Sequence, residues 1–354
     1  MKKSNKTAKI VVAVIIFCLL YIVLAFRTLS TEFHLSPEWT VDISDVETVP
    51  ATERTIPYRL GQNIGYFTED GKVASRIPYP FKASISDFHY ASYGADNMST
   101  EFYNSDGTFA GTINERGFPF FDGPYVYTFL PGGNAFASCG PKGEVEWKFE
   151  SYAPITAFAT SGGGVVAGLA DGNIVSFEHN GKQIQKFAPG GSEIPVILGA
   201  DISEDGRTVA CVSGQNRQRF VVAQKTSDGH SKIIFHEYLN EDFNSQVLVK
   251  FGDDGNTIYY NYRGGLGIVN LEKLSSKHVP IDGRIVQIEE AADPNLIVVL
   301  SEKDSKYTVT VVEPVDHPLA KFSYDAECSF IKTKGNKLFV GRDNKISCLR
   351  LSRK

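Results

Sequence analysis

Residues 155–189 contain four short runs in which apolar and polar side chains alternate. The runs are separated by Gly-Gly-Gly, Asp-Gly and Asn-Gly. Alternation with a period of two residues is typical of strands that bury one face, and Asp-Gly and Asn-Gly accept the positive φ angles of two-residue hairpin turns. No part of the pattern fits a helix, so it predicts a four-stranded antiparallel meander.

The same pattern recurs along most of the chain. Asn256, Asn295 and Asn336 stand at equivalent positions before apolar runs, 39 and 41 residues apart, which is the repeat expected for a four-stranded unit. A single meander cannot bury both of its faces. We therefore expect an all-β fold in which the meanders stack around an axis as the blades of one β-propeller.

The number of blades depends on the two ends of the chain. Six complete meanders begin near residues 84, 123, 154, 195, 245 and 284. We expect residues 328–351 to supply three strands of a further blade and residues 72–78 to supply its fourth, which closes the ring and leaves no open sheet edge. This predicts seven blades. The alternative is eight, with residues 55–60 and 63–68 in an independent N-terminal blade.

A different pattern precedes the repeats. Residues 10–26 are seventeen consecutive apolar residues, preceded by four lysines and followed by Arg27. This length is at the short end for a transmembrane helix, and the lysines favour a cytoplasmic N-terminus. We predict a cytoplasmic basic tail at residues 1–9, a membrane anchor at residues 10–26, a polar tether at residues 27–55 and the propeller at residues 56–354. A cleaved signal peptide is the alternative to the anchor.

This topology predicts a single-pass protein of the cytoplasmic membrane with its propeller outside the cytoplasm, in the periplasm. The first thirty residues hold five of the 36 basic residues and no acidic residue, so the rest of the chain is more acidic than the net charge of −5 suggests. An acidic surface does not bind the phosphate backbone of nucleic acid, which needs clustered Lys and Arg. We expect no nucleic-acid partner.

Two sets of repeats resemble known propeller families. The segments ISEDGRTVACVS (from residue 202) and FGDDGNTIYYNY (from residue 251) resemble the turn and following apolar strand of TolB-type, WD-like repeats. The shorter units LADGNIVSF and GKQIQKF are similar to PQQ-like repeats of quinoprotein-type propellers, which include the BamB-like periplasmic scaffolds. The resemblance covers most of residues 60–351 and implies a propeller fold there. The chain has only Trp39 and Trp147, whereas quinoprotein dehydrogenases repeat tryptophan, so we expect no quinone cofactor.

No motif indicates catalysis or metal binding. The seven histidines are dispersed without zinc-ligand spacing, and Asp253, Asp254 and Asn256 match only a fragment of a calcium loop. No lysine follows the glycines of SGGGVV as it would in a phosphate-binding loop, and no nucleophile elbow is present. We predict no catalytic, cofactor-binding or metal-binding residues and a protein that is not an enzyme.

Two segments are candidates for partner binding. The aromatic run at residues 118–129 is expected to pack mainly between blades, but its first residues flank Pro119 in a predicted loop, where exposed rings would form a binding patch. The segment SGQNRQRF from Ser213 predicts a basic hairpin tip on an acidic body. The candidate partner-binding residues are Phe118, Phe120, Phe121, Arg217 and Arg219.

These observations predict a protein-binding or scaffolding module. The alternatives are a sensor of a cell-envelope ligand and a propeller enzyme (hydrolase, lyase or quinoprotein) with its site in the central channel. No pattern in the sequence identifies a small ligand.

Overall fold

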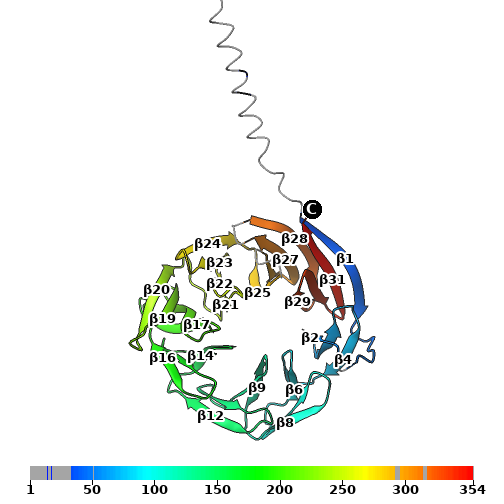
Figure 1. Cartoon of the computed structure of the whole chain (residues 1–354), viewed down its shortest axis with the longest axis horizontal. Helices are drawn as coiled ribbons and strands as arrows, with labels where there is room; N and C mark the ends of the chain where they lie inside the picture. The colour runs from blue at the N-terminus through cyan, green and yellow to red at the C-terminus, as the bar shows by residue number, and fades with distance from the viewer. Residues whose placement is uncertain are drawn as a thin grey trace, which may run out of the picture.

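The computed structural model of the chain describes residues 33–50, 52–291, 296–313 and 317–353, together with Val14 and Phe17. In these ranges thirty-one β-strands form eight antiparallel sheets. The sheets stand radially around a central axis, each as one blade of a propeller (Figure 1). The all-β propeller expected from the repeats is confirmed.

Six blades consist of four strands that follow the chain from the innermost to the outermost position. Blade 2 is β5 (Lys82–Ile85), β6 (His89–Tyr93), β7 (Thr100–Asn104) and β8 (Phe109–Ile113); blade 3 is β9 (Phe118–Asp122), β10 (Tyr125–Phe129), β11 (Ala135–Cys139) and β12 (Val145–Glu150). Blade 4 is β13 (Ile155–Ser161), β14 (Gly164–Leu169), β15 (Ile174–Phe177) and β16 (Gln183–Phe187); blade 5 is β17 (Ile194–Ile202), β18 (Thr208–Gln215), β19 (Arg219–Lys225) and β20 (Ser231–Tyr238). Blade 6 is β21 (Val249–Phe251), β22 (Thr257–Tyr262), β23 (Gly265–Asn270) and β24 (Ser275–Pro280); blade 7 is β25 (Arg284–Glu290), β26 (Ile297–Lys303), β27 (Lys306–Glu313) and β28 (His317–Asp325).

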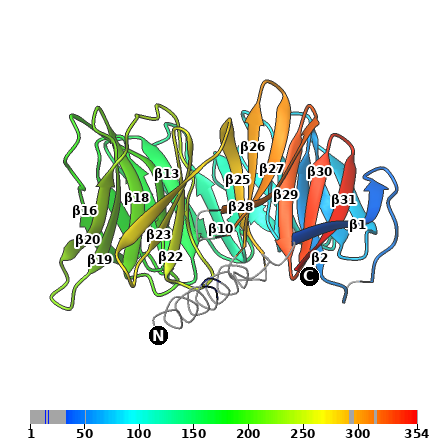
Figure 2. The same cartoon turned by 90° about the horizontal axis from the view of Figure 1, so that it is seen from above.

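The remaining two blades contain the ends of the described chain. Blade 8 consists of β29 (Ser329–Lys334), β30 (Lys337–Arg342), β31 (Lys345–Arg353) and, as its outermost strand, β1 (Phe33–Asp42). Blade 1 consists of β2 (Thr55–Leu60), β3 (Asn63–Thr68) and β4 (Val73–Pro78) only. The pairing of β1 with β31 closes the ring, and Figure 2 shows the two strands at the same edge of the molecule.

The prediction of seven blades is therefore wrong. Residues 55–60, 63–68 and 73–78 pair with one another and form their own blade, which makes eight. The strand that completes blade 8 comes from residues 33–42, inside the segment expected to be an irregular tether. A register shift between Pro37 and Trp39 interrupts the period of this strand, which is why the pattern did not reveal it.

The predicted fold also included a membrane-spanning helix at residues 10–26. Apart from Val14 and Phe17, that segment lies outside the described residues. Across the described ranges no helix has both the length and the apolar character needed to cross a membrane, and the fold that these ranges show is an eight-bladed propeller. The predicted location outside the cytoplasm is not tested by these residues and stays a prediction.

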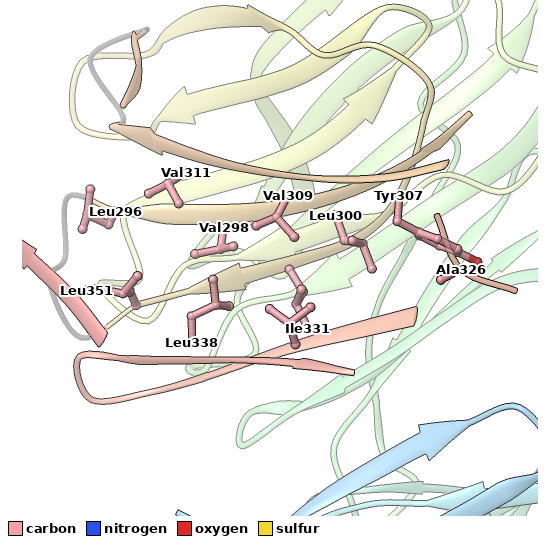
Figure 3. Close-up of a cluster of buried hydrophobic side chains, with 12 residues drawn as sticks. Leu296, Val298, Leu300, Tyr307, Val309, Val311, Ala326, Ile331, Leu338 and Leu351 are labelled. Atoms are coloured by element: carbon pink, nitrogen blue, oxygen red, sulfur yellow. The ribbon is translucent and has the colours of Figure 1, made fainter. Parts of the chain in front are cut away.

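The core lies between the blades. Eight clusters of buried hydrophobic side chains occur in the described part, one at each interface between neighbouring blades. In Figure 3, Val298 and Val309 of blade 7 face Ile331 and Leu338 of blade 8. Alternate side chains of each strand enter opposite interfaces, so the period-two pattern of the sequence buries both faces of a blade. The cluster with the fewest buried members lies between blades 1 and 2.

Among the residues that the structure describes, none forms an innermost strand of blade 1. In the four-stranded blades the innermost strand begins at the face of the propeller where the preceding outermost strand ends; we call this the proximal face and the opposite one the distal face. The strand β4 reaches β5 through residues 79–81, so it ends at the proximal face. Asn63 pairs with Pro78, which places the turn between β2 and β3 at the same face. The strand β2 therefore runs opposite to the innermost strands of the other blades and corresponds to a second strand.

The segment that connects β1 to β2 does not replace the missing strand. Val46 forms a bridge with Val73 on the outermost strand β4, and the N–H of Glu47 donates to the carbonyl of Val73 at 2.8 Å. The connection thus passes along the outer side of blade 1. As a result β2, a second strand by direction, borders the central channel.

Candidate functional site

A groove of about 610 Å³ opens on the proximal face between blades 2 and 3. One part of its lining is aromatic and apolar, and the other part is cationic. We define this aromatic groove by the side chains of Phe81, Tyr93, Phe118, Phe129, Leu130, Arg59, Lys82 and Arg116. Phe81 and Phe118 are 49% and 46% exposed, so both rings present apolar surface to the solvent.

The strand ends of blade 3 build one wall of the groove. Phe118 begins β9 and pairs with Phe129 at the end of β10, and the two rings stack with their centroids 4.9 Å apart. The backbone of Gly117 passes so close to this hairpin that a Cβ there would lie 2.1 Å from the carbonyl oxygen of Phe129. A residue without a side chain is therefore needed beside Phe118.

Two of the three cations of the groove lack an acidic partner. The Nε of Arg59 donates to the hydroxyl of Tyr79 at 3.0 Å, and its guanidinium lies 5.5 Å from the centre of that ring. Neither Arg59 nor Lys82 has a carboxylate within 4.0 Å among the residues that the structure describes, whereas Arg116 pairs with Asp96 at 3.1 Å on the surface. None of the described residues that line the groove is acidic, and their side chains therefore give it positive charge.

A second cavity, of about 390 Å³, lies in the central channel beside blade 1. We call it the channel cavity. It is lined by Pro57, Tyr58 and Arg59 of β2 and by innermost-strand residues of blades 2, 3, 7 and 8, with Asp87, Asp122, Gln287 and Lys332 as polar members. Arg59 lines both spaces, so the aromatic groove meets the channel cavity at this side chain.

The polar side chains of the channel cavity mostly join neighbouring blades. Burial raises the pKa of Asp122, which accepts a hydrogen bond from the hydroxyl of Thr160 in blade 4. The side-chain amide of Gln287 accepts from the N–H of Ile331 at 3.0 Å and donates to its carbonyl at 2.7 Å. Lys332 forms an ion pair with Glu289 at 3.2 Å. These groups are occupied by structural bonds.

Side-chain hydrogen bonds also join neighbouring blades elsewhere around the ring. The carboxylate of Asp201 accepts from the N–H of Phe251 in the next blade at 2.7 Å, and Ser161 donates its hydroxyl to the carbonyl of Ser203 at 2.9 Å. Within the described ranges no three His, Cys, Asp or Glu side chains are placed to hold a metal ion. The polar side chains of the channel thus hold neighbouring blades together, whereas the groove exposes the rings of Phe81 and Phe118.

The structure separates the three predicted phenylalanines. They lie in strand β9 and not in a loop, with alternate rings on opposite faces. Phe118 lines the groove, half-buried Phe120 contacts Phe158 at 5.4 Å between ring centroids, and Phe121 is 4% exposed in the core between blades 2 and 3. Of the three predicted phenylalanines, Phe118 is therefore a surface residue of the groove, and Phe120 and Phe121 pack between blades.

The two predicted arginines lie in blade 5, away from the groove. Arg217, at the tip between β18 and β19, has a positive φ of 70° and holds its guanidinium 4.9 Å from the ring centre of Tyr238. Arg219 is 7% exposed and donates to the carbonyl of Pro189. Arg219 thus has a structural position, and neither arginine contributes to the site formed by Phe118.

Sequence reasoning missed Arg59, Phe81, Lys82 and Arg116. These residues come from three segments that are far apart in the chain, and only the ring of blades brings them together. The single local signal is Phe81, an apolar residue between Pro80 and Lys82 in a short connection, where no strand would bury its ring.

Comparisons with known proteins agree with this architecture. A family model described as "beta-propeller protein" matches residues 1–353. A protein of Treponema pallidum (strain Nichols), itself named only as uncharacterized, is 28% identical over 354 residues, which cover 97% of this chain and 94% of the relative.

Two solved structures share the fold at low sequence identity. BamB from Moraxella catarrhalis has a TM-score of 0.61 and 12% identity, covering 90% of this chain and all of that chain. A chain of the Mitotic Checkpoint Complex has a TM-score of 0.55 and 10% identity, covering 92% of this chain and 94% of that one. The resemblance to BamB-like propellers is thus confirmed at the level of the fold.

Proposed function

The chain belongs to the beta-propeller protein family, and on that premise we propose that it is a protein-binding module whose aromatic groove receives a segment of a partner protein. The observation that carries the proposal is the combination, in one groove, of half-exposed Phe81 and Phe118 with Arg59 and Lys82, neither of which pairs with a carboxylate of the described ranges. Because the described chain leaves about half of each ring exposed, a partner would remove that apolar surface from water.

General features of protein interfaces support this proposal. Aromatic residues and arginine are enriched among the side chains that contribute most to binding, and they act best in pockets that a partner can desolvate. The ring of Phe118 is held in place by its stacking on Phe129, so little of its side-chain freedom is lost on binding. That a chain of the Mitotic Checkpoint Complex has the same fold also supports a role in assembly.

An enzyme centred in the channel is less well supported. Asp122, Gln287 and Lys332 already bond to neighbouring residues, and no described side chain that lines the channel cavity is paired with a base as an activated nucleophile would be. A protein-binding role requires no such pairing.

Photocrosslinking from the groove tests the proposal. Benzoylphenylalanine would replace Phe118 or Phe81 in the full chain, and adducts would be resolved after irradiation of the cells that produce the protein. Phe109 is the matched control, because it is 59% exposed but begins β8 at the distal face. We expect discrete protein adducts from positions 118 and 81 and none of the same mass from position 109. Identical adducts from all three positions, or none from the groove, would contradict the proposal.

A further inference from the structure

We propose that the partner segment binds as an added β-strand along β2, in the innermost position that blade 1 lacks, with an acidic side chain opposite Arg59. The inference rests on the proposed function and specifies how the partner is held. Addition of an extended segment to an open sheet edge is a general mode of peptide recognition, in which backbone hydrogen bonds supply affinity and alternate side chains supply specificity.

The register of β2 identifies the backbone groups that face the channel. The turn at residues 61–62 has two residues, so Leu60 and Asn63 form a hydrogen-bonded pair, and every second residue back along β2 also bonds to β3. The intervening residues Pro57 and Arg59 turn their backbone groups away from β3. They face the channel cavity, which both residues line.

The neighbouring strand confirms this register. Tyr66 is the residue opposite Pro57, and its N–H donates to the hydroxyl of Ser75 on β4 at 3.2 Å, away from β2. This edge of β2 therefore turns the carbonyl of Pro57, a buried residue, and both the N–H and the carbonyl of exposed Arg59 toward the channel cavity. None of these three groups has a hydrogen-bond partner within the described part of the chain.

Two further features are typical of an open edge at this position. Pro57 has no N–H, and within sheets proline is confined to edges where its missing donor would point away from a neighbouring strand. The interface between blades 1 and 2 has only Ile64, Tyr79 and Ala83 in its buried cluster, with Ile77, Ile85 and Tyr90 packed against it, which makes it the smallest of the inter-blade cores. An added strand would complete the blade and extend that core.

The charged side chains near β2 determine which side chains the added segment should carry. In an antiparallel hydrogen-bonded pair the two side chains lie on the same face, about 5.5 Å apart at Cα, so the residue opposite Arg59 would contact its guanidinium. An acidic residue there would neutralise an arginine that has no carboxylate partner in the described chain. Asp87 and Asp122 line the deeper cavity and would repel a second acid, so we expect neutral or apolar residues on either side. The residue two positions from the acid lies on the same face of the added strand and would reach the aromatic groove, which begins at Arg59.

Two substitutions at one position separate the backbone bond from the charge. Arg59→Gln removes the charge and keeps the N–H, whereas Arg59→Pro removes both; neither breaks the β2–β3 ladder, because Arg59 does not bond to β3. The probe is the set of 12-residue peptides selected from a random display library on the full chain, with affinity measured by fluorescence polarisation. We expect Arg59→Gln to weaken binding about tenfold, and Arg59→Pro to weaken it about tenfold further.

Backbone methylation of the peptide provides a measurement that does not depend on the folding of any variant. Single N-methyl groups placed along the selected peptide should weaken binding to the unmodified protein at every second residue, since only alternate N–H groups face β2. Equal affinities of the Gln and Pro variants, or N-methyl effects without this alternation, would overturn strand addition. If Phe118→Ser still weakened binding in that case, the groove would remain a protein-binding site. If no selected peptide lost affinity on Phe118→Ser or Arg59→Gln, both proposals would be wrong.

Discussion

The carboxylate of Asp201 in blade 5 accepts a hydrogen bond from the backbone N–H of Phe251 in blade 6, with 2.7 Å between Oδ2 and the nitrogen. Its other oxygen accepts from the N–H of Ile202 at 2.8 Å. Burial nevertheless raises the pKa of Asp201 to about 7, because these two bonds offset only part of the loss of hydration and Asp122 adds a like charge. The positive charge of Lys250 acts against this shift.

The raised pKa of Asp201 predicts how the free energy of unfolding changes with pH. The folded state holds the Asp201 proton up to about pH 7 and the unfolded state only to about pH 4, so this group lowers the free energy of unfolding as the pH rises between those values. The contribution is at most about 4 kcal/mol. Asp201→Asn should flatten the change in stability between about pH 4.5 and pH 7.5 relative to the unmodified protein, measured by urea unfolding at each pH. Parallel pH profiles of the two proteins would contradict this assignment.

The aromatic run provides a matched pair of substitutions. Phe121 is buried in the core between blades 2 and 3, so Phe121→Ala should destabilise the propeller by about 3–5 kcal/mol through the cavity it leaves. Phe118→Ala removes a half-exposed ring and should cost less than about 1 kcal/mol. Urea denaturation of both variants tests the division, and equal losses of stability would show that Phe118 belongs to the core and not to the groove.

The two arginines of blade 5 should also differ in how much their removal destabilises the protein. Arg219→Ala leaves the buried carbonyl of Pro189 without its donor, which we expect to cost about 1–3 kcal/mol. Arg217→Ala removes an exposed cation–π contact with Tyr238 and should change stability by no more than about 1 kcal/mol. Thermal denaturation of the two variants compares them directly. A loss of stability in Arg217→Ala that matched or exceeded that in Arg219→Ala would reverse the roles of the two side chains.

The repeated strands and turns could be predicted from the sequence because each depends on local chemistry. Alternation specifies which side chains of a strand are buried together, and Asp-Gly or Asn-Gly specifies the turn, so the six four-stranded blades between residues 82 and 325 follow from short windows. The strand at residues 33–42 could not be predicted in this way. Pro37 and the register shift beside it remove the alternation, and its partner β31 lies more than 300 residues away in the chain.

The candidate site was predictable only in part for a related reason. Phe118 could be singled out because it belongs to a dense aromatic run, but whether a ring of that run faces the core or the surface depends on which of its two strand faces meets a neighbouring blade. Arg59 and Lys82 carry no local signal at all. Their significance comes from the absence of a carboxylate nearby in the described chain and from the strand that blade 1 lacks, and both are properties of the assembled ring.

The last prediction concerns the closure of the ring by β31. The final strand β31 lies between β30 and β1, and it pairs with both along most of its length. Deletion of residues 345–351 would remove the buried side chains of Ile346, Cys348 and Leu351 and would leave β1 without a strand to pair with in its sheet.

The expected result of this deletion is loss of cooperative folding, and not the trimming of a tail. Each fully buried aliphatic side chain contributes roughly 1.5–3 kcal/mol, and the ladders on both sides of β31 are lost as well, against a net stability of about 5–15 kcal/mol for a typical domain. The control is Lys345→Ala, which changes an exposed residue of the same strand and should leave the melting temperature nearly unchanged. A deletion variant that melted cooperatively within a few degrees of this control would mean that the other blades form a stable ring without β31. In that case the pairing of β1 with β31 would be an addition to a ring already closed by contacts between blades 1 and 8.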